Sequence, residues 1–197
     1  MQSPIYWHPL LYHTAMKLSY KDRFETRYSA LARYIPEGSQ VLEICMGDSY
    51  FYRNYLKTRC LDYACADINP VFVRHAKQLG LKADVIDIGK DPIPSADIIL
   101  LHGSLYHFIP FEKKLIEKLL AACKSKVIIS ESTENLSNAS NPLQSFIGAT
   151  LSKAKSGQSK IKFTRDSLRV SFAAFEKHIE VWEESPDNRE IIIVLKK

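Results

Sequence analysis

The sequence predicts an α/β protein with a mostly parallel sheet, helices on both faces and an antiparallel hairpin at the C-terminus. Short apolar runs that read as buried strands alternate with segments of helical periodicity, which is the pattern of a parallel sheet covered by helices. The last two apolar runs, HIEVWEE and REIIIVLKK, are separated only by SPDN, so we expect them to pair as a hairpin. One strand near the sheet edge is therefore expected to run against the others.

The N-terminal segment is expected to be helical. Apolar residues recur every three or four positions from Met16 to Ile35, which predicts an amphipathic helix that ends before Pro36. We expect residues 1–35 to form a helical cover ahead of the first strand, which is VLEIC. A helix rich in tyrosine is predicted to follow Gly47.

The middle of the chain carries clear helix and strand signals. Asn69 and Pro70 form a helix cap and a first helical position, and Gly80 ends that helix. SADIILL and KVIISE are continuous apolar runs of the kind found in strands buried on both faces, and a helix beginning near Phe111 separates them.

Two further helices are predicted before the hairpin. The Asn-Pro device recurs at 141–142, and a loop rich in Lys, Ser and Gly follows over 152–162. Thr164 is expected to cap a short helix. With no internal repeat, the 197 residues are predicted to form a single domain spanning 1–197.

Composition narrows the class of protein. The chain has 46 % hydrophobic residues and a mean hydropathy of −0.17, as expected for a globular protein, and it contains no apolar run long enough to span a bilayer. The N-terminus has histidine and proline where a secretory signal carries a basic end and an apolar stretch. We therefore expect a cytoplasmic protein that binds no membrane.

The chain has four cysteines, which are Cys45, Cys60, Cys65 and Cys123. They lack the spacing of metal ligands, so neither a metal site nor a disulfide is predicted. The net charge of +5 is mild, although a basic segment runs from Lys153 to Arg169. Such a segment fits a solvated surface, and it also fits an acidic small molecule or RNA as a partner.

The order of elements in residues 40–67 predicts a nucleoside site. A strand, a small-residue turn, a helix and a second strand ending in Asp67 place a carboxylate beside a backbone turn. A dinucleotide turn requires glycines, yet only Gly47 is present, flanked by Cys45 and Ser49. Dinucleotide dehydrogenase sheets also do not usually end in an antiparallel hairpin. Both features argue against NAD.

The segment VLEICMGDS instead resembles the first motif of class I S-adenosylmethionine-dependent methyltransferases, which is an acid followed by Gly-x-Gly-x-Gly. Glu43 matches the acid and Gly47 the middle glycine, whereas Cys45 and Ser49 depart from the motif. The resemblance implies a Rossmann-like methyltransferase sheet and S-adenosylmethionine as cofactor. Backbone N–H groups of the turn would face the methionine carboxylate of this donor.

The resemblance continues along the chain. ACADINP is similar to the end of the second strand in that family, where Asp67 would accept hydrogen bonds from the ribose hydroxyls. By the same match Asp87 would accept from the adenine amino group, with Ile68 and Ile88 beside the ring. The donor-binding set implied in this way also contains Cys45, Leu101 and His102. A helix cap or an ordinary loop carboxylate is the alternative reading of each acid.

Residues after the fourth and fifth strands are the candidates for catalysis. His102, Tyr106 and His107 follow the fourth strand and Glu131 ends the fifth, so all four are expected at the crevice where an acceptor would sit. A histidine near neutral pKa could remove a proton from an attacking hydroxyl, and His102 is preferred. Buried structural histidines are the alternative, and an acceptor that is already nucleophilic needs no base.

The predicted function is methyl transfer to a small molecule by a monomer or homodimer. No long insertion is present to form a substrate domain, and LHGSLYHF replaces the Asn/Asp-Pro-Pro-aromatic sequence common in enzymes that methylate base nitrogens. Tyr6, Trp7 and Tyr12 are expected either to cover the donor or to pack in the core. Two alternatives remain open, a methyltransferase fold that binds without catalysis and an RNA methyltransferase.

Overall fold

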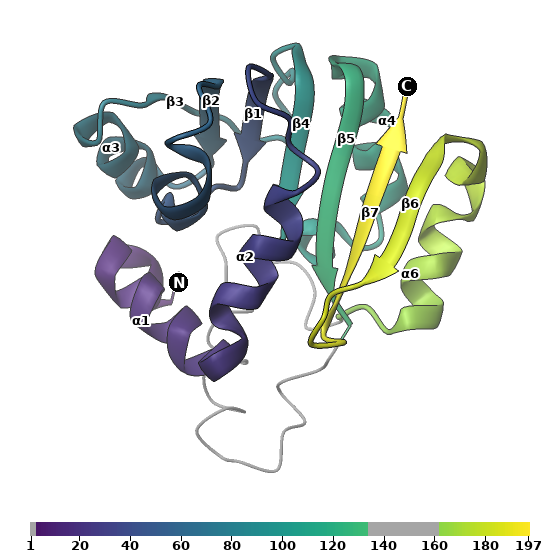
Figure 1. Cartoon of the computed structure of the whole chain (residues 1–197), viewed down its shortest axis with the longest axis horizontal. Helices are drawn as coiled ribbons and strands as arrows, with labels where there is room; N and C mark the ends of the chain where they lie inside the picture. The colour runs from purple at the N-terminus through teal and green to yellow at the C-terminus, as the bar shows by residue number, and fades with distance from the viewer. Residues whose placement is uncertain (1–2, 134–161) are drawn as a thin grey trace.

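The computed structural model describes residues 3–133 and 162–197. Its centre is a seven-stranded sheet of order β3-β2-β1-β4-β5-β7-β6 (Figure 1). The strands are β1 (Gln40–Ile44), β2 (Asp62–Asp67), β3 (Lys82–Val85), β4 (Ala96–His102), β5 (Cys123–Ser132), β6 (Ile179–Glu184) and β7 (Glu190–Lys196).

Strand directions confirm the predicted sheet. The pairs from β3 to β5 are parallel, and β7 runs antiparallel to both β5 and β6. The hairpin expected from the two C-terminal apolar runs is therefore present. Because β7 lies between β5 and β6, the reversed strand is next to the edge of the sheet and not at the edge itself.

Helices cover both faces of the sheet. The α-helices are α1 (Pro9–Tyr20), α2 (Phe24–Ala32), α3 (Pro70–Gln78), α4 (Glu112–Ala122) and α6 (Arg165–Phe172). Shorter helical segments are η1 (Pro4–Trp7), η2 (Lys21–Arg23), η3 (Tyr52–Leu56), η4 (Leu105–Phe108) and η6 (Ala173–His178).

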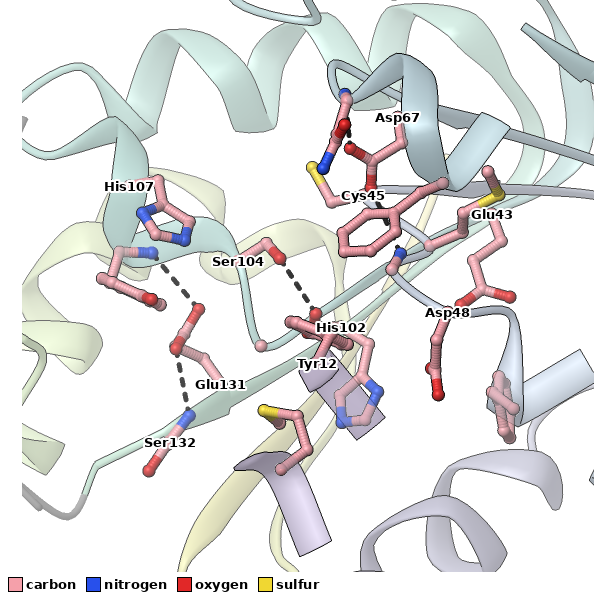
Figure 2. A pocket seen from close by; sticks show the side chains of 18 of the residues that line it. Tyr12, Glu43, Cys45, Asp48, Asp67, His102, Ser104, His107, Glu131 and Ser132 are labelled. Atoms are coloured by element: carbon pink, nitrogen blue, oxygen red, sulfur yellow. Dashed lines mark hydrogen bonds between the residues drawn. The ribbon is translucent and has the colours of Figure 1, made fainter. Parts of the chain in front are cut away.

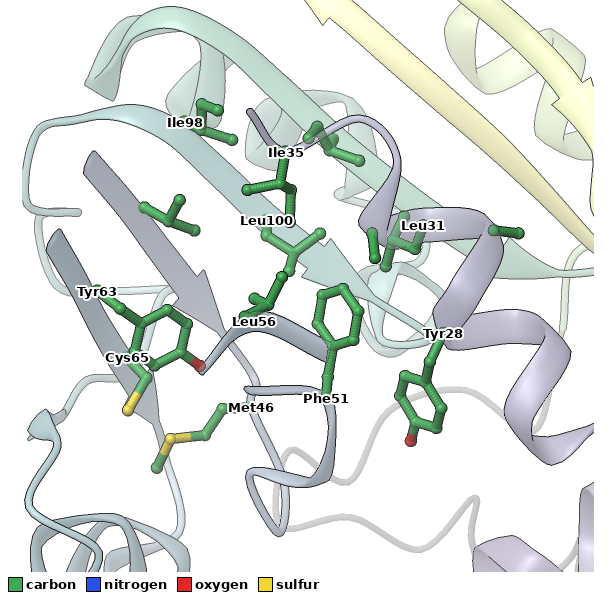
Figure 3. Packing of buried hydrophobic residues seen from close by; sticks show 14 of the residues in the cluster. Tyr28, Leu31, Ile35, Met46, Phe51, Leu56, Tyr63, Cys65, Ile98 and Leu100 are labelled. Carbon is green, nitrogen blue, oxygen red and sulfur yellow. The ribbon is translucent and has the colours of Figure 1, made fainter. Parts of the chain in front are cut away.

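Alternation along the strands divides the core into two clusters. Ile98 and Leu100 of β4 pack with residues of α1, α2, η3 and α3, and Figure 3 shows Leu31 and Leu56 in this layer. The neighbouring side chains Ile99 and Leu101 point to the other face, where they pack with α4 and α6. Successive strand residues face opposite sides of a sheet, so a strand covered on both faces is apolar throughout.

The single N-terminal helix predicted from Met16 to Ile35 is wrong in its extent. Helix α1 begins earlier, at Pro9, and the chain breaks at Lys21, whose φ of 52° lies in the left-handed region. Helix α2 then starts at Phe24. The apolar periodicity continues across the break because both helices bury the same kind of face, so the pattern alone does not reveal the bend.

The predicted caps are confirmed where the structure describes them. The Asn69 side chain accepts a hydrogen bond from the Val71 N–H over 3.0 Å, and Pro70 is the first residue of α3. Thr164 and Ser167 form a reciprocal capping box at the start of α6. The cap predicted at 141–142 and the loop up to residue 161 lie outside the described residues.

Candidate functional site

A large pocket opens at the edge of the sheet where β1, β2, β4 and β5 reach their C-terminal ends. It encloses about 1380 Å³ between protein atoms, including solvent at its mouth. Figure 2 shows Asp67, Cys45 and Asp48 on one side of the pocket and His107 and Glu131 on the other. Open α/β sheets bind their ligands in crevices at this edge.

The turn after β1 has the backbone shape of a glycine-rich motif without the glycines. Cys45, Gly47 and Ser49 have φ values of 56°, 59° and 59°. This left-handed region costs an L-residue about 1 kcal/mol or more, which is why glycine normally occupies it. Cys45 and Ser49, which depart from the motif, therefore adopt a backbone conformation that glycine favours, and the surrounding fold has to hold them in it.

Asp67 lies at the end of β2, directly against this turn. Its carboxylate accepts hydrogen bonds from the Gly47 N–H over 3.2 Å and from the Asn69 N–H over 2.8 Å. Burial raises the pKa of the carboxyl to about 6, although the backbone donors lower it. The buried carboxylate has one backbone bond on each oxygen and further acceptor capacity facing the pocket.

Two more acids surround the turn. Glu43 of β1 is buried and accepts a hydrogen bond from the Tyr63 hydroxyl over 2.5 Å, and burial raises its pKa to about 8. Asp48 accepts from the Tyr50 N–H over 3.3 Å and lies 3.0 Å from the His13 ring. Both side chains line the pocket, so carboxyl groups gather at this end of it.

Asp87, Ile68 and Ile88 line the same pocket, and they also line a second, neighbouring pocket. The Asp87 carboxylate accepts from the Gly89 N–H over 3.1 Å and pairs with Lys90 over 3.0 Å. It is partly exposed, so its oxygens are accessible to a ligand. The structure thus brings Asp67 and Asp87 to one cavity, with apolar side chains between them.

The N-terminal segment lies over the pocket. The Tyr6 carbonyl accepts a hydrogen bond from the Asn69 side chain over 2.8 Å, which ties this segment to the end of β2. Tyr12 lies so close to the turn that a Cβ added at Gly47 would be 2.9 Å from its ring. Tyr6 and Tyr12 line the pocket, whereas Trp7 is 60 % exposed and does not.

His102 is in the pocket, but its imidazole is engaged in a buried ionic cluster. Its Nε2 is 2.6 Å from a guanidinium nitrogen of Arg27 and 3.3 Å from the Glu190 carboxylate. Burial and the nearby guanidinium lower its pKa, so the ring is neutral near pH 7. The Nε2 atom thus lies between a guanidinium, which can only donate, and a carboxylate, which can only accept. A catalytic role for His102 stays a prediction.

Tyr106, His107 and Glu131 meet at the other end of the pocket. The Glu131 carboxylate accepts from the Tyr106 N–H over 3.2 Å and from the Ser132 N–H over 3.1 Å. Burial raises its pKa to about 7. His107 also lines the neighbouring pocket, and burial lowers its pKa to about 4. Its Nδ1 has no hydrogen-bond partner among the described residues.

Leu101 does not line the pocket. It is fully buried on β4, in the cluster that faces α4 and α6. The residues Cys45, Gly47 and His102, assigned to the donor with it, do line the pocket.

Sequence reasoning missed three cationic pocket residues: Arg27, Lys162 and Arg189. The position of Arg27 gave a signal, because an arginine that follows Phe24 by three residues lies on the apolar stripe of α2 and is 2 % exposed. Lys162 was counted only as part of a basic segment. Arg189 directly precedes the apolar strand β7, and a polar residue at that position does not indicate a functional site.

Two structural searches gave no site or span. Within residues 3–133 and 162–197, no group of three or more His, Cys, Asp or Glu side chains is arranged to hold a metal ion. Over those same ranges, no helix combines the length and apolar character needed to traverse a bilayer.

Comparisons with known proteins establish the fold. No protein-family model matches the chain, and no curated protein matches it significantly. Among solved structures, one similar chain belongs to the Haloferax volcanii complex of the Trm112 methyltransferase activator with a protein named as a methyltransferase. Its TM-score is 0.71 at 14 % identity, and the match covers 100 % of this chain and 98 % of that one.

Human N-acetylserotonin methyltransferase, solved in complex with S-adenosylmethionine, has a TM-score of 0.65 at 16 % identity, over 96 % of this chain and 55 % of that one. A protein from Rhodobacter sphaeroides named as a Zn-dependent alcohol dehydrogenase has a TM-score of 0.66 at 13 % identity, over 92 % of this chain and 96 % of that one. At such identities the likeness fixes the fold and not the reaction.

Proposed function

We propose that this chain, which has the fold of the class I S-adenosylmethionine-dependent methyltransferases, binds S-adenosylmethionine and transfers its methyl group to a small molecule. The observation that carries the proposal is the convergence of Asp67 and Asp87 on one cavity beside the turn at 45–49. Three successive parallel strands supply these groups in the order that the donor requires.

The chemistry of Asp67 fits the ribose of this donor. The carboxylate is buried, burial raises its pKa, and its hydrogen-bond partners among the described residues are backbone N–H groups and not a cation. Two adjacent hydroxyl groups would donate to the acceptor positions that the backbone N–H groups leave open. The unused acceptor positions of this carboxylate support a ligand with two adjacent hydroxyl groups at Asp67.

The remaining parts of the donor fit the neighbouring residues. Ile68 and Ile88 would contact the adenine ring, and the Asp87 carboxylate would accept from its amino group. Backbone N–H groups of the turn at 45–49 favour the methionine carboxylate, and Glu43 would face the ammonium group directly or through water.

When bound, S-adenosylmethionine supplies an electrophilic methyl group. The residues of this chain then have to orient donor and acceptor and exclude water, which is the main requirement of an in-line displacement. Tyr6, Tyr12 and Met16 from the N-terminal segment cover the pocket and would exclude water from the donor. Tyr106 and Glu131 stand where the acceptor would lie, and Glu131 has a pKa of about 7, suited to proton transfer near neutral pH.

The two alternatives stay predictions. The non-catalytic reading rested on Cys45 and Ser49, and both adopt the left-handed backbone conformation that glycine favours. The RNA reading rested on a basic segment, of which residues 153–161 lie outside the described residues. In its described part, Arg165 pairs with Glu184 and Arg169 with Glu176, and Lys162 lines the pocket.

Isothermal titration with S-adenosylmethionine and its demethylated product S-adenosylhomocysteine tests the proposal. We expect micromolar binding of both, and Asp67→Ala should weaken binding by about tenfold or more because hydrogen bonds to a charged group are lost. Asp84→Ala is the matched control, since this exposed aspartate of β3 does not line the pocket. A wild-type protein that binds neither compound would refute the proposal.

A further inference from the structure

The end of the pocket away from Asp67 is rich in cations. Arg27 from α2, Arg189 at the start of β7 and Lys162 before α6 all line it, with Tyr106 and Glu131. We call these five residues the basic end. The opposite end is lined by the ionisable side chains Glu43, Asp48, Asp67 and Asp87. Cationic and acidic groups thus lie at different ends of the pocket.

The carboxylates near the basic end are those of Glu190 and Glu131. Glu190 is fully used: it pairs with the Arg27 Nε over 3.0 Å and accepts from the Tyr20 and Ser130 hydroxyls over 2.8 and 2.6 Å. Against the effect of burial, the Arg27 guanidinium holds the pKa of Glu190 below its usual range. The Glu190 carboxylate is thus engaged by the Arg27 guanidinium and by two hydroxyl groups, and His102 Nε2 lies 3.3 Å from it.

Glu131 is the second carboxylate near the basic end, and its hydrogen bonds within the described residues are to backbone N–H groups. Its two oxygens accept from the Tyr106 and Ser132 N–H groups, and it forms no ion pair with Lys162. With a pKa of about 7 it is only partly ionised near neutral pH. Neither the Glu190 nor the Glu131 carboxylate is therefore paired with Lys162.

Lys162 is the cation that these carboxylates leave without an ion pair. Its ammonium lies 4.9 Å from the centre of the Tyr106 ring, and no ion pair or hydrogen bond joins it to another described residue. Burial lowers its pKa, although the nearby Glu131 carboxylate acts in the opposite direction. Arg27 adds unused donor capacity, because its Nη1 is buried and has no hydrogen-bond partner among residues 3–133 and 162–197.

Resting on the proposed function, we propose that the methyl acceptor is a small acid whose anionic group is bound by Lys162 and Arg27 at the basic end. An anion there would pair with the ammonium and accept the N–H that Arg27 leaves unused. The Tyr106 ring offers a face for the body of the acceptor. The adenosyl donor would occupy the acidic end, so each ligand would meet the charge opposite to its own.

Binding of matched acids and neutral analogues tests this inference. S-adenosylhomocysteine is first titrated alone, which tests the donor site separately. Acetate, benzoate and phenyl phosphate are then titrated with acetamide, benzamide and phenol as uncharged counterparts, in the presence and absence of S-adenosylhomocysteine, by calorimetry and ligand-observed NMR. We expect at least one anion to bind about tenfold or more tightly than its counterpart. The carboxylate and phosphate arms show which anionic group fits.

Variants test which residue causes the preference for an anion over its neutral counterpart. Lys162→Met should reduce the anion preference to about threefold or less, and Lys162→Arg should retain it because the charge is kept. Lys113→Met, at an exposed lysine of α4, is the control and should behave as wild type. The inference is overturned if no anion binds better than its neutral counterpart, or if Lys162→Met keeps the preference. Failure of S-adenosylhomocysteine to bind would instead count against the proposed function.

Discussion

The affinity of the pocket for S-adenosylhomocysteine should depend on pH through Asp67. Burial raises the pKa of this carboxyl to about 6, and only the ionised form accepts fully from both ribose hydroxyls. With the competent fraction near nine tenths at pH 7 and near one tenth at pH 5, the apparent dissociation constant should rise by about tenfold over that interval.

The titration of Asp67 should also change the free energy of unfolding, in the direction opposite to its effect on ligand affinity. A raised pKa in the folded protein means that Asp67 favours folding when protonated, so its contribution is complete below the unfolded value of 3.8 and is lost as pH rises through about 6. Its full size is on the order of 3 kcal/mol. The free protein is therefore expected to lose this contribution over the interval in which ligand affinity increases.

Calorimetric titration of S-adenosylhomocysteine at closely spaced values between pH 5 and pH 7 measures the first effect, and urea unfolding over the same range measures the second. Asp67→Asn is the control, because it removes the titrating group and should flatten this part of both profiles. An affinity that does not change in the wild type, or that changes equally in Asp67→Asn, would refute the assignment of Asp67 as the ribose ligand.

Three further results are expected. Ser49→Gly should raise the free energy of unfolding by about 0.5–1 kcal/mol in urea, because relief of the left-handed strain outweighs the greater entropy of the unfolded chain. A lower free energy of unfolding in this variant would contradict the reasoning. Glu190→Gln should cost about 3 kcal/mol by leaving a buried guanidinium uncompensated, whereas the exposed Glu180→Gln should be nearly neutral. Gly47→Ala should destabilise more than Gly38→Ala, as both have positive φ but only the former meets a tyrosine ring; equal losses of melting temperature would disprove the close contact.

Much of the fold follows from local signals in the sequence. The apolar runs of β4, β5 and β7 and the Asn-Pro cap of α3 each specify their element within a few residues, and the SPDN segment brings β6 and β7 together. The break at Lys21 was not predictable, because a left-handed lysine follows from the packing of α1 and α2 and not from its neighbours in sequence.

The acidic end of the site was predictable and the basic end was not. Asp67 and Asp87 follow strands directly, so sheet topology alone places them together. Arg27 and Glu190 meet only because α2 packs near the start of β7, and such a contact between distant segments leaves no local pattern. Lys162 was hidden among other basic residues, where charge alone does not distinguish a pocket side chain from a solvated one.

The most direct test of the central claim is a crystal structure of the protein grown with S-adenosylhomocysteine. The account predicts the ribose hydroxyls within hydrogen-bond distance of the Asp67 carboxylate and the adenine amino group at Asp87, with the ring between Ile68 and Ile88. A ligand bound elsewhere, or one whose sugar and base leave both carboxylates without contact, would contradict it.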